Sequence, residues 1–534
     1  MMKHLYKNTW QLSRFIVKRD RLRIPIWLFS LAILTFSVAL SFTELYSTEQ
    51  DRQAMAETMK NPAITAMVGP GYGLENYTAG AMMAHQMLLF TAVAVAIMSI
   101  LLIARYTRAD EEDGHIELIR SLPTGRLSTL QAAMNVLFGT NILLAFLTGL
   151  GLFILNIESM NLEGSLIYGA ALGATGLFFT ALTAVFAQLS ESSRGTIGLS
   201  FGILIIAYLI RAVGDVSNEA LSWFSPLGWI VGAQVFVNNE WWPIVLTVGV
   251  ALLLALLALY LNATRDLGSG LIPAKPGRKH ASAFLQGPLG LLFTLQRTGL
   301  MAWAIGVLIL GVSYGSVLGD LESFIEDIEM MGEFLAPVEG VSLTEQFILM
   351  ILSIMAMICT IPALMAVLKL IGEERKKRTE HLLSRAVSRT RLMGSALMIA
   401  IFISVVMLSL AAIGLWSASV FVMEDSISFS TLYSGIMGYL PAIWVMVGFA
   451  LLLIGIMPKA TSLIWLYLIY SFLVVYLGGL LQFPQWMSNL SPFGHTPQYP
   501  VEEMNFMTLF VQLMIAVALM MIGFIGYNRR DIEG

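Results

Sequence analysis

The chain has 534 residues, of which 57% are hydrophobic and only 12% are charged. Soluble globular proteins carry roughly 45–50% apolar and about 25% charged residues, so a soluble fold of this length would have too few charges to cover its apolar side chains. A net charge of −4 gives no general attraction to nucleic acid. The composition therefore predicts an all-α polytopic membrane protein in a lipid bilayer.

Before the first apolar run, residues 3–21 are predicted to form one amphipathic helix that lies in the membrane interface. Its basic residues, spaced by three, four or seven positions, share one face. Twelve apolar runs then follow, each about long enough to cross a bilayer. They lie near 24–43, 84–105, 130–156, 165–189, 196–213, 243–262, 300–318, 346–371, 393–422, 434–457, 462–481 and 506–527.

The basic residues are distributed unequally between the two sides of this topology. Of the 31 Lys and Arg residues, 28 fall on the side of both termini, and only Arg52, Lys60 and Arg211 do not. The other side holds 22 of the 35 acidic residues, eight of them in loop 319–345. The positive-inside rule therefore predicts a multi-pass protein with cytoplasmic N and C termini.

Charged residues are expected at the ends of spans and not well inside them. Lys369 and Arg211 stand at predicted span ends. Because Arg211 lies at the outer end of the fifth span, we expect that span to be short or kinked. Proton- or ion-coupled transporters usually need a buried ionisable group, so this distribution argues against such a mechanism.

The chain contains an internal repeat. Segment 109–126 aligns without gaps to 372–389 at an offset of 263, and Arg265-Asp266-Leu267 matches Arg530-Asp531-Ile532 at 265. The repeat predicts two parallel six-span halves related by a pseudo-twofold axis along the membrane normal. The predicted organisation is an interfacial helix (1–23), a first half (24–262), a cytoplasmic linker with a second interfacial helix (263–299) and a second half (300–534).

The repeated segment is short, polar and predicted to be cytoplasmic in both halves. It is interpreted as one short helix followed by a breaker, Pro123 and Gly125 in the first copy and Ser388 in the second. A solvated loop is the usual explanation of a charge run. The duplication favours a protein-docking surface, although residues 110–113 are acidic and residues 375–378 are basic.

Catalytic motifs are missing from the sequence. No Gly-Lys dipeptide offers a P-loop, and neither an HExxH nor a CxxC metal-binding pattern occurs. We therefore expect no enzyme domain, no cofactor and no metal site in this chain. The spans are rich in Met and aromatic residues, which repack around varied ligands and are candidates for a substrate path, with core or lipid packing as the alternative. The candidates are Met87, Phe90, Tyr208, Met350, Met355, Trp465, Tyr467 and Tyr470.

Together these features resemble an ABC-2-type exporter permease. The resemblance covers nearly the whole chain and rests on the duplicated Glu-x-(Ile/Leu) segments, the paired Arg-Asp-(Leu/Ile) motifs, and a Ser-Pro-x-Gly re-entry before the last span of each half. The re-entry residues are Pro226, Gly228, Pro492 and Gly494. Two fused units are similar to the polyketide antibiotic exporters of Gram-positive bacteria, although His495 replaces Trp229 in the second copy.

This resemblance implies a division of labour in a bacterial plasma membrane. A separate ABC ATPase, two copies per chain, would bind ATP and Mg²⁺, and helices 110–122 and 373–385 would be the coupling helices that receive its motion. The substrate would be a hydrophobic or amphipathic antibiotic or drug. The implied docking residues are Glu111, Glu117, Arg120, Arg126, Glu374, Glu380, Arg385 and Arg389.

Three other functions remain open at this point. A proton-coupled secondary transporter would also have twelve spans in two halves but would need no partner. A membrane-embedded enzyme would use paired carboxylates, and the only candidates are the acidic residues of segment 320–333. A sensor subunit would need a large external domain, which the chain lacks.

Overall fold

The computed structural model shows a helical chain. In the described part every regular element is a helix, and eleven of these helices are long and apolar enough to cross a membrane. The prediction of an all-α polytopic membrane protein with about twelve spans is therefore confirmed. The structure describes residues 2–60, 62–266, 268–272, 280–318, 343–385, 387–423, 427–477, 484–497, 499 and 505–531.

The chain forms two compact units, Met1–Gly277 and Arg278–Gly534. In the first unit α10 is the central helix and packs against α6, α9, α11 and α14. The long helices of this unit are α3 (Arg23–Leu45), α6 (Ala79–Ala104), α9 (Ser128–Ile154), α10 (Leu162–Leu189), α11 (Ser193–Ser217) and α14 (Trp242–Thr264).

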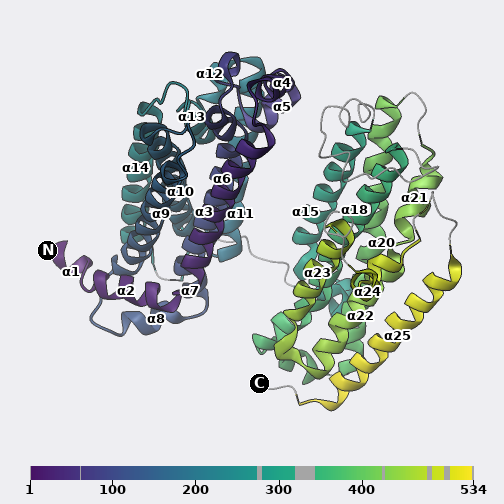
Figure 1. The fold of residues 1–534 in the computed structure, drawn as a ribbon. Helices are drawn as coiled ribbons and strands as arrows, with labels where there is room; N and C mark the ends of the chain where they lie inside the picture. Colours follow the sequence, from purple (N-terminus) through teal and green to yellow (C-terminus); the bar gives the residue numbers. More distant parts are fainter. Residues whose placement is uncertain are drawn as a thin grey trace. The chain divides into compact units, whose positions relative to one another are not determined.

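Short helices collect at the two ends of the first unit (Figure 1). One end, here called the α8 end, holds α1 (Met2–Leu5), α2 (Thr9–Arg19), η2 (Arg105–Ala109), α7 (Asp110–Glu112) and α8 (His115–Arg120). The opposite end, here called the α13 end, holds α4 (Glu49–Met59), α5 (Pro62–Val68), η1 (Leu74–Asn76), α12 (Glu219–Ser222) and α13 (Pro226–Val231).

The second unit repeats this element order. Its long helices are α15 (Pro288–Val317), α18 (Leu343–Arg375), α20 (Arg389–Val422), α22 (Leu440–Ile456), α23 (Leu463–Leu477) and α25 (Phe506–Arg529). Its short helices are η3 (Ala283–Gln286), α19 (Arg378–Leu383), α21 (Phe429–Met437), η4 (Pro458–Ala460), α24 (Gln485–Leu490) and η5 (Pro492–His495). The predicted span 462–481 corresponds to α23, and its last residues lie outside the described part.

The interfacial helices predicted before the first span of each half differ from the structure. The predicted helix 3–21 is wrong, because Asn8 adopts a left-handed conformation (φ 66°) that separates α1 from α2. The chain then breaks again before α3. Pro25, in the first turn of α3, has no N–H to donate a helical hydrogen bond back across this break. The second half has Met301 at the matching position. There α15 runs without a break from Pro288 through the predicted interfacial helix and span.

Close helix packing in the first unit depends on glycines of α10. A Cβ at Gly169 would clash with the carbonyl oxygen of Ala145 on α9, and a Cβ at Gly173 would meet the backbone of Asn141. In the second unit α20, which corresponds to α9, packs closely on α15 instead. Gly311 of α15 and Gly414 of α20 are in contact there. Small residues let helix backbones approach in this way.

A glycine substitution tests the packing of α9 on α10. Gly169→Ala should destabilise the first unit by about 1–3 kcal/mol, because the methyl group forces the two helices apart. Thermal unfolding of the detergent-purified protein measures the effect. Gly139→Ala on α9 is the control, since nothing lies within 4 Å of a Cβ at that position. Equal melting temperatures for the two variants would contradict the packing described.

Candidate functional site

The repeated polar segment adopts the same two-part structure in both units. In the first, α6 continues through the π-helical turn η2 into α7, and Gly114 (φ 75°) then turns the chain into the separate helix α8. In the second, α18 runs to Arg375, and Lys377 (φ 57°) makes the turn into α19. The predicted single helices 110–122 and 373–385 are therefore wrong, because their first residues belong to the preceding long helices.

A buried carboxylate ties the long helix of the first unit to its last span. Glu111 Oε2 lies 2.9 Å from Arg265 Nη2, and the two side chains are 7% and 5% exposed. Arg126, which follows α8, donates a hydrogen bond of 2.9 Å to the carbonyl oxygen of Arg265. Arg108 adds a second cation 3.2 Å from Glu111. The network connects the end of α6, the segment after α8 and the end of α14.

The second unit contains the equivalent network at matching positions. Glu374 Oε2 lies 2.6 Å from Arg530 Nη2, and Arg389 donates a hydrogen bond of 2.6 Å to the carbonyl oxygen of Arg530. No second cation lies within ion-pairing distance of Glu374 in the described residues, because Ile371 occupies the position of Arg108. Each unit therefore holds its short helix with one Glu–Arg–Arg network.

The predicted docking residues divide into two groups. Glu111 and Glu374 are engaged inside the units, and Arg126 and Arg389 hold backbone carbonyl oxygens. The remaining four, Glu117, Arg120, Glu380 and Arg385, are exposed on α8, on α19 or just after α19. Beside them Leu118 is 71% exposed and Leu122 is 58% exposed. The surfaces that remain accessible are thus α8 and α19 themselves.

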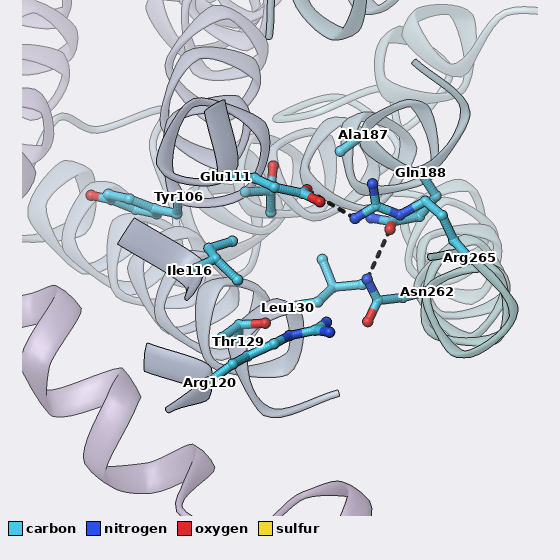
Figure 2. A pocket seen from close by; sticks show the side chains of 11 residues that line it. Tyr106, Glu111, Ile116, Arg120, Thr129, Leu130, Ala187, Gln188, Asn262 and Arg265 are labelled. Carbon is cyan, nitrogen blue, oxygen red and sulfur yellow. Dashed lines mark hydrogen bonds and ion pairs between the residues drawn. The ribbon is translucent and has the colours of Figure 1, made fainter. Parts of the chain in front are cut away.

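A small polar pocket lies behind α8 (Figure 2). Its free volume of about 20 Å³ suffices for about one water molecule. Its charged and amide-bearing lining residues are Glu111, Arg120, Gln188, Asn262 and Arg265. Asn262 donates a hydrogen bond of 2.9 Å to Gln188, which joins α14 to α10 next to the Glu111–Arg265 pair. The pocket is therefore part of the helix junction and is too small for a drug-sized substrate.

The N-terminal segment clamps the chain that follows α8. Gly125 donates a backbone hydrogen bond of 3.0 Å to the carbonyl oxygen of Lys7, and Ser128 Oγ donates one of 2.7 Å to the same oxygen. Asn8 Nδ2 donates to the carbonyl oxygen of Pro123 at 3.0 Å. Because a Cβ at Gly125 would clash with the carbonyl group of Leu5, only glycine fits beneath this segment.

Further charged contacts attach α7 to its neighbours. Asp110 pairs with Arg19 of α2 at 2.8 Å, and the Glu112 carboxylate accepts hydrogen bonds from the backbone N–H (2.8 Å) and hydroxyl (2.7 Å) of Ser193 at the start of α11. In the second unit Glu373, the counterpart of Asp110, pairs instead with Lys369 of its own helix at 2.8 Å. The first unit thus links α2 to α7 by an ion pair.

The re-entry segments before the last spans are equivalent in the two units. Ser225 and Ser491 accept hydrogen bonds from the backbone N–H groups two residues later, and Pro226 and Pro492 follow them directly. A Cβ at Gly228 or Gly494 would clash with the carbonyl oxygen of Ser222 or Ser488.

The replacement of Trp229 by His495 keeps the local hydrogen bond. Trp229 Nε1 donates to the carbonyl oxygen of Trp223 at 2.6 Å, and His495 Nε2 lies 2.7 Å from the carbonyl oxygen of Asn489, the residue that matches Trp223. Since a carbonyl oxygen only accepts, the histidine carries its proton on Nε2.

Arg211, which was expected at the outer end of the fifth span, lies in the last two turns of α11, towards the α13 end of the first unit. This helix is continuous over 25 residues, from Ser193 to Ser217, so the fifth span is not short. Arg211 is fully buried within it and pairs with Asp215 at 2.7 Å. Arg211 also donates to the carbonyl oxygen of Ala66 on α5 at 2.6 Å. The arginine is tolerated because Asp215 matches its charge and both terminal nitrogens of its guanidinium donate hydrogen bonds.

The residues predicted to line a substrate path have mixed surroundings. Tyr208, Tyr467 and Tyr470 use their hydroxyl groups to donate hydrogen bonds to the carbonyl oxygens of Met67, Leu490 and Met487. Met355 is fully packed in the second unit, Phe90 is 40% exposed, and Met87, Met350 and Trp465 are partly buried. The acidic loop 319–345 falls outside the described side chains.

Arg265 and Arg530 are central to the two networks, but the sequence interpretation did not name them among the candidate site residues. The sequence marks them as a duplicated motif but does not show what they contact. A signal was available, because Glu111, Arg126 and Arg265 each recur as the same residue type 263 or 265 positions later. Three residues duplicated at almost one offset indicate one shared structural unit.

Comparison with known proteins identifies the family. The family model "Multidrug efflux system permease Rv1217c, C-terminal domain" matches residues 14–261 and 285–528. The multidrug efflux system permease protein Rv1217c of Mycobacterium tuberculosis (strain ATCC 25618 / H37Rv) is 34% identical over 534 residues, which cover 99% of this chain and 96% of that protein. The chain therefore belongs to the Rv1217c family of multidrug efflux system permeases.

Proposed function

We propose that this chain is the permease subunit of an ATP-driven exporter of the ABC-2 type. The observation that carries the proposal is the duplicated Glu–Arg–Arg network, which fixes α8 and α19 to the ends of long helices in both units. Two equivalent, exposed short helices on rigid supports are what a pair of partner subunits would need for docking. The family membership supports a role in drug efflux.

The orientation follows from the distribution of basic residues. The α8 end of the first unit carries most of its Lys and Arg residues, and segment 372–389 holds six of the fourteen in the second unit, so the positive-inside rule supports a cytoplasmic position for both. Both termini then also lie in the cytoplasm of a bacterial cell. An ATPase that binds there has ATP and Mg²⁺ within reach, whereas the sequence has no P-loop of its own.

The contacts provide a route for motion from the docking helix to the spans. A displacement of α8 reaches α14 through Arg126 and the Glu111–Arg265 pair. The displacement also reaches α6, because α8 follows α7 in the chain and α7 is the direct continuation of α6. Glu112 extends the route to the start of α11 through Ser193. Two ATPase copies, one below each unit, would close on ATP binding and move the units.

The substrate class follows from the chemistry of the spans. Apolar and aromatic side chains dominate them, and the buried Arg211–Asp215 pair is neutralised internally. Because Arg211 and Asp215 neutralise each other, neither is free to bind a strongly charged substrate. The proposed cargo is a hydrophobic or amphipathic compound, and antibiotics of the polyketide class are the first to test.

Charge reversal on the two docking helices tests the proposal. The variant Glu117→Lys/Glu380→Lys should lose ATPase stimulation by the permease, because both substituted side chains are exposed on the proposed docking faces. Hydrolysis by the purified complex in lipid nanodiscs measures this effect. The control Glu75→Lys/Glu240→Lys carries the same charge change on exposed residues of the first unit's α13 end. Wild-type stimulation in the first variant would contradict the assignment of α8 and α19.

A further inference from the structure

Arginines outnumber carboxylates at the α8 end of the first unit. Next to the small pocket behind α8 lies a larger, open one of about 400 Å³, and Arg120 lines both. The open pocket is lined by Arg120, Thr124, Gly125, Arg126 and Asp266.

The carboxylates nearby leave Arg120 without an ion pair. Glu111 is already paired with Arg265 at 2.9 Å and with Arg108 at 3.2 Å. The exposed Asp266 lines the open pocket, but no carboxylate of the described residues lies within ion-pairing distance of Arg120. Burial lowers the pKa of Arg120, and the positive charges of Arg126 and Arg265 lower it further against the opposing effect of Glu111.

The geometry of the open pocket favours an anionic group from outside. Arg126 commits only one nitrogen, Nη2, to the carbonyl oxygen of Arg265. The guanidinium of Arg120 points toward the small pocket behind α8 (Figure 2). Arg120 and Arg126 both line the open pocket, and arginine side chains are suited to bind a carboxylate. The exposed Leu118 on α8 and Leu122 just after it would supply apolar contact to the same partner.

We propose that this pocket receives an acidic side chain of the ATPase subunit, and that it distinguishes the first docking site from the second. The inference rests on the proposed function. In the second unit Arg389 matches Arg126, but Leu383 occupies the position of Arg120. Exposed cations that pair with no described carboxylate lie instead on both sides of α19, at Arg375, Lys376 and Lys377 before the helix and at Arg385 after it. The two ATPase copies therefore dock through different charge contacts.

The substitution Arg120→Leu, which installs the residue of the second unit, tests this inference. Binding of the purified ATPase to the full chain in nanodiscs is measured by biolayer interferometry at several salt concentrations. The variant should lose affinity at one of two binding sites by at least about 10-fold, because one charge-assisted contact is lost. Its binding should also depend less on salt. The control Arg194→Leu removes an exposed arginine that no described carboxylate pairs with.

A charge-swap experiment identifies the partner side chain. Arg120→Glu is combined with single Asp→Arg and Glu→Arg substitutions on the ATPase surface, and one such pair should restore binding. The inference would be overturned if Arg120→Leu bound the ATPase with wild-type affinity, or if Arg194→Leu lost as much affinity as Arg120→Leu. The proposed function would survive either result as long as the wild-type chain binds the ATPase at two sites. If the wild-type chain binds no ATPase, the proposed function itself fails.

Discussion

Replacement of Arg530 by methionine should be the most damaging change in the duplicated Glu–Arg–Arg networks. It leaves the buried Glu374 without a cation, since Arg530 is its only ion-pair partner in the described residues. Removal of one partner of a buried pair costs about 3–5 kcal/mol. Because the Arg530 side chain is still 15% exposed, we expect about 2–4 kcal/mol. Thermal unfolding of the purified protein gives the measurement.

The first unit provides a matched comparison. Arg265→Met removes the equivalent arginine, but Arg108 remains 3.2 Å from Glu111 and continues to neutralise it. We therefore expect Arg265→Met to cost less than Arg530→Met. The double variant Glu374→Gln/Arg530→Met should regain part of the loss, because no buried charge is left unpaired. If Arg265→Met and Arg530→Met were equally destabilising, the neutralising role of Arg108 would be refuted.

A second large effect is expected at the opposite end of the first unit. Arg211→Met leaves Asp215, whose side chain is 4% exposed, with Ser222 as its remaining hydrogen-bond partner. It also removes the hydrogen bonds that hold α5 to α11 through the carbonyl oxygens of Ala66 and Met67. A loss of about 3–5 kcal/mol follows from breaking a fully buried pair. Residues 62–69 should then exchange amide hydrogens faster, which mass spectrometry measures.

Two further variants separate charge from shape at this position. Arg211→Lys keeps the charge but loses the planar fork, so it should protect residues 62–69 only in part. Arg211→Met/Asp215→Asn removes both charges and should recover stability without restoring the contact to Ala66. Unchanged exchange of residues 62–69 in Arg211→Met would show that Arg211 does not hold α5.

The sequence was sufficient for the fold class and for the repeat, because both depend on local patterns. Apolar runs identify spans by length alone, and identical residue types at one offset reveal duplication. The divided docking segment was less accessible. Gly114 suggests a turn, but Lys377 at the equivalent position adopts the same left-handed conformation and has no sequence signal for it.

The charged residues show where sequence reasoning fails. Arg211 was placed at the end of a span because a charge in an apolar run is costly in lipid. Its acceptors on α5 lie about 145 positions earlier in the chain, and no pattern predicts that contact. Likewise, no sequence pattern shows that Glu111 is buried, because its partner Arg265 lies 154 positions later. Tertiary contacts decide whether such residues are buried or exposed.

The most direct test of the central claim is transport into inverted membrane vesicles that contain this chain with or without its ATPase partner. The account predicts that a hydrophobic antibiotic accumulates only when the ATPase and ATP are both present, and that a protonophore leaves this accumulation unchanged. Accumulation that needs only a pH gradient, without the ATPase, would contradict it and would indicate a proton-coupled transporter.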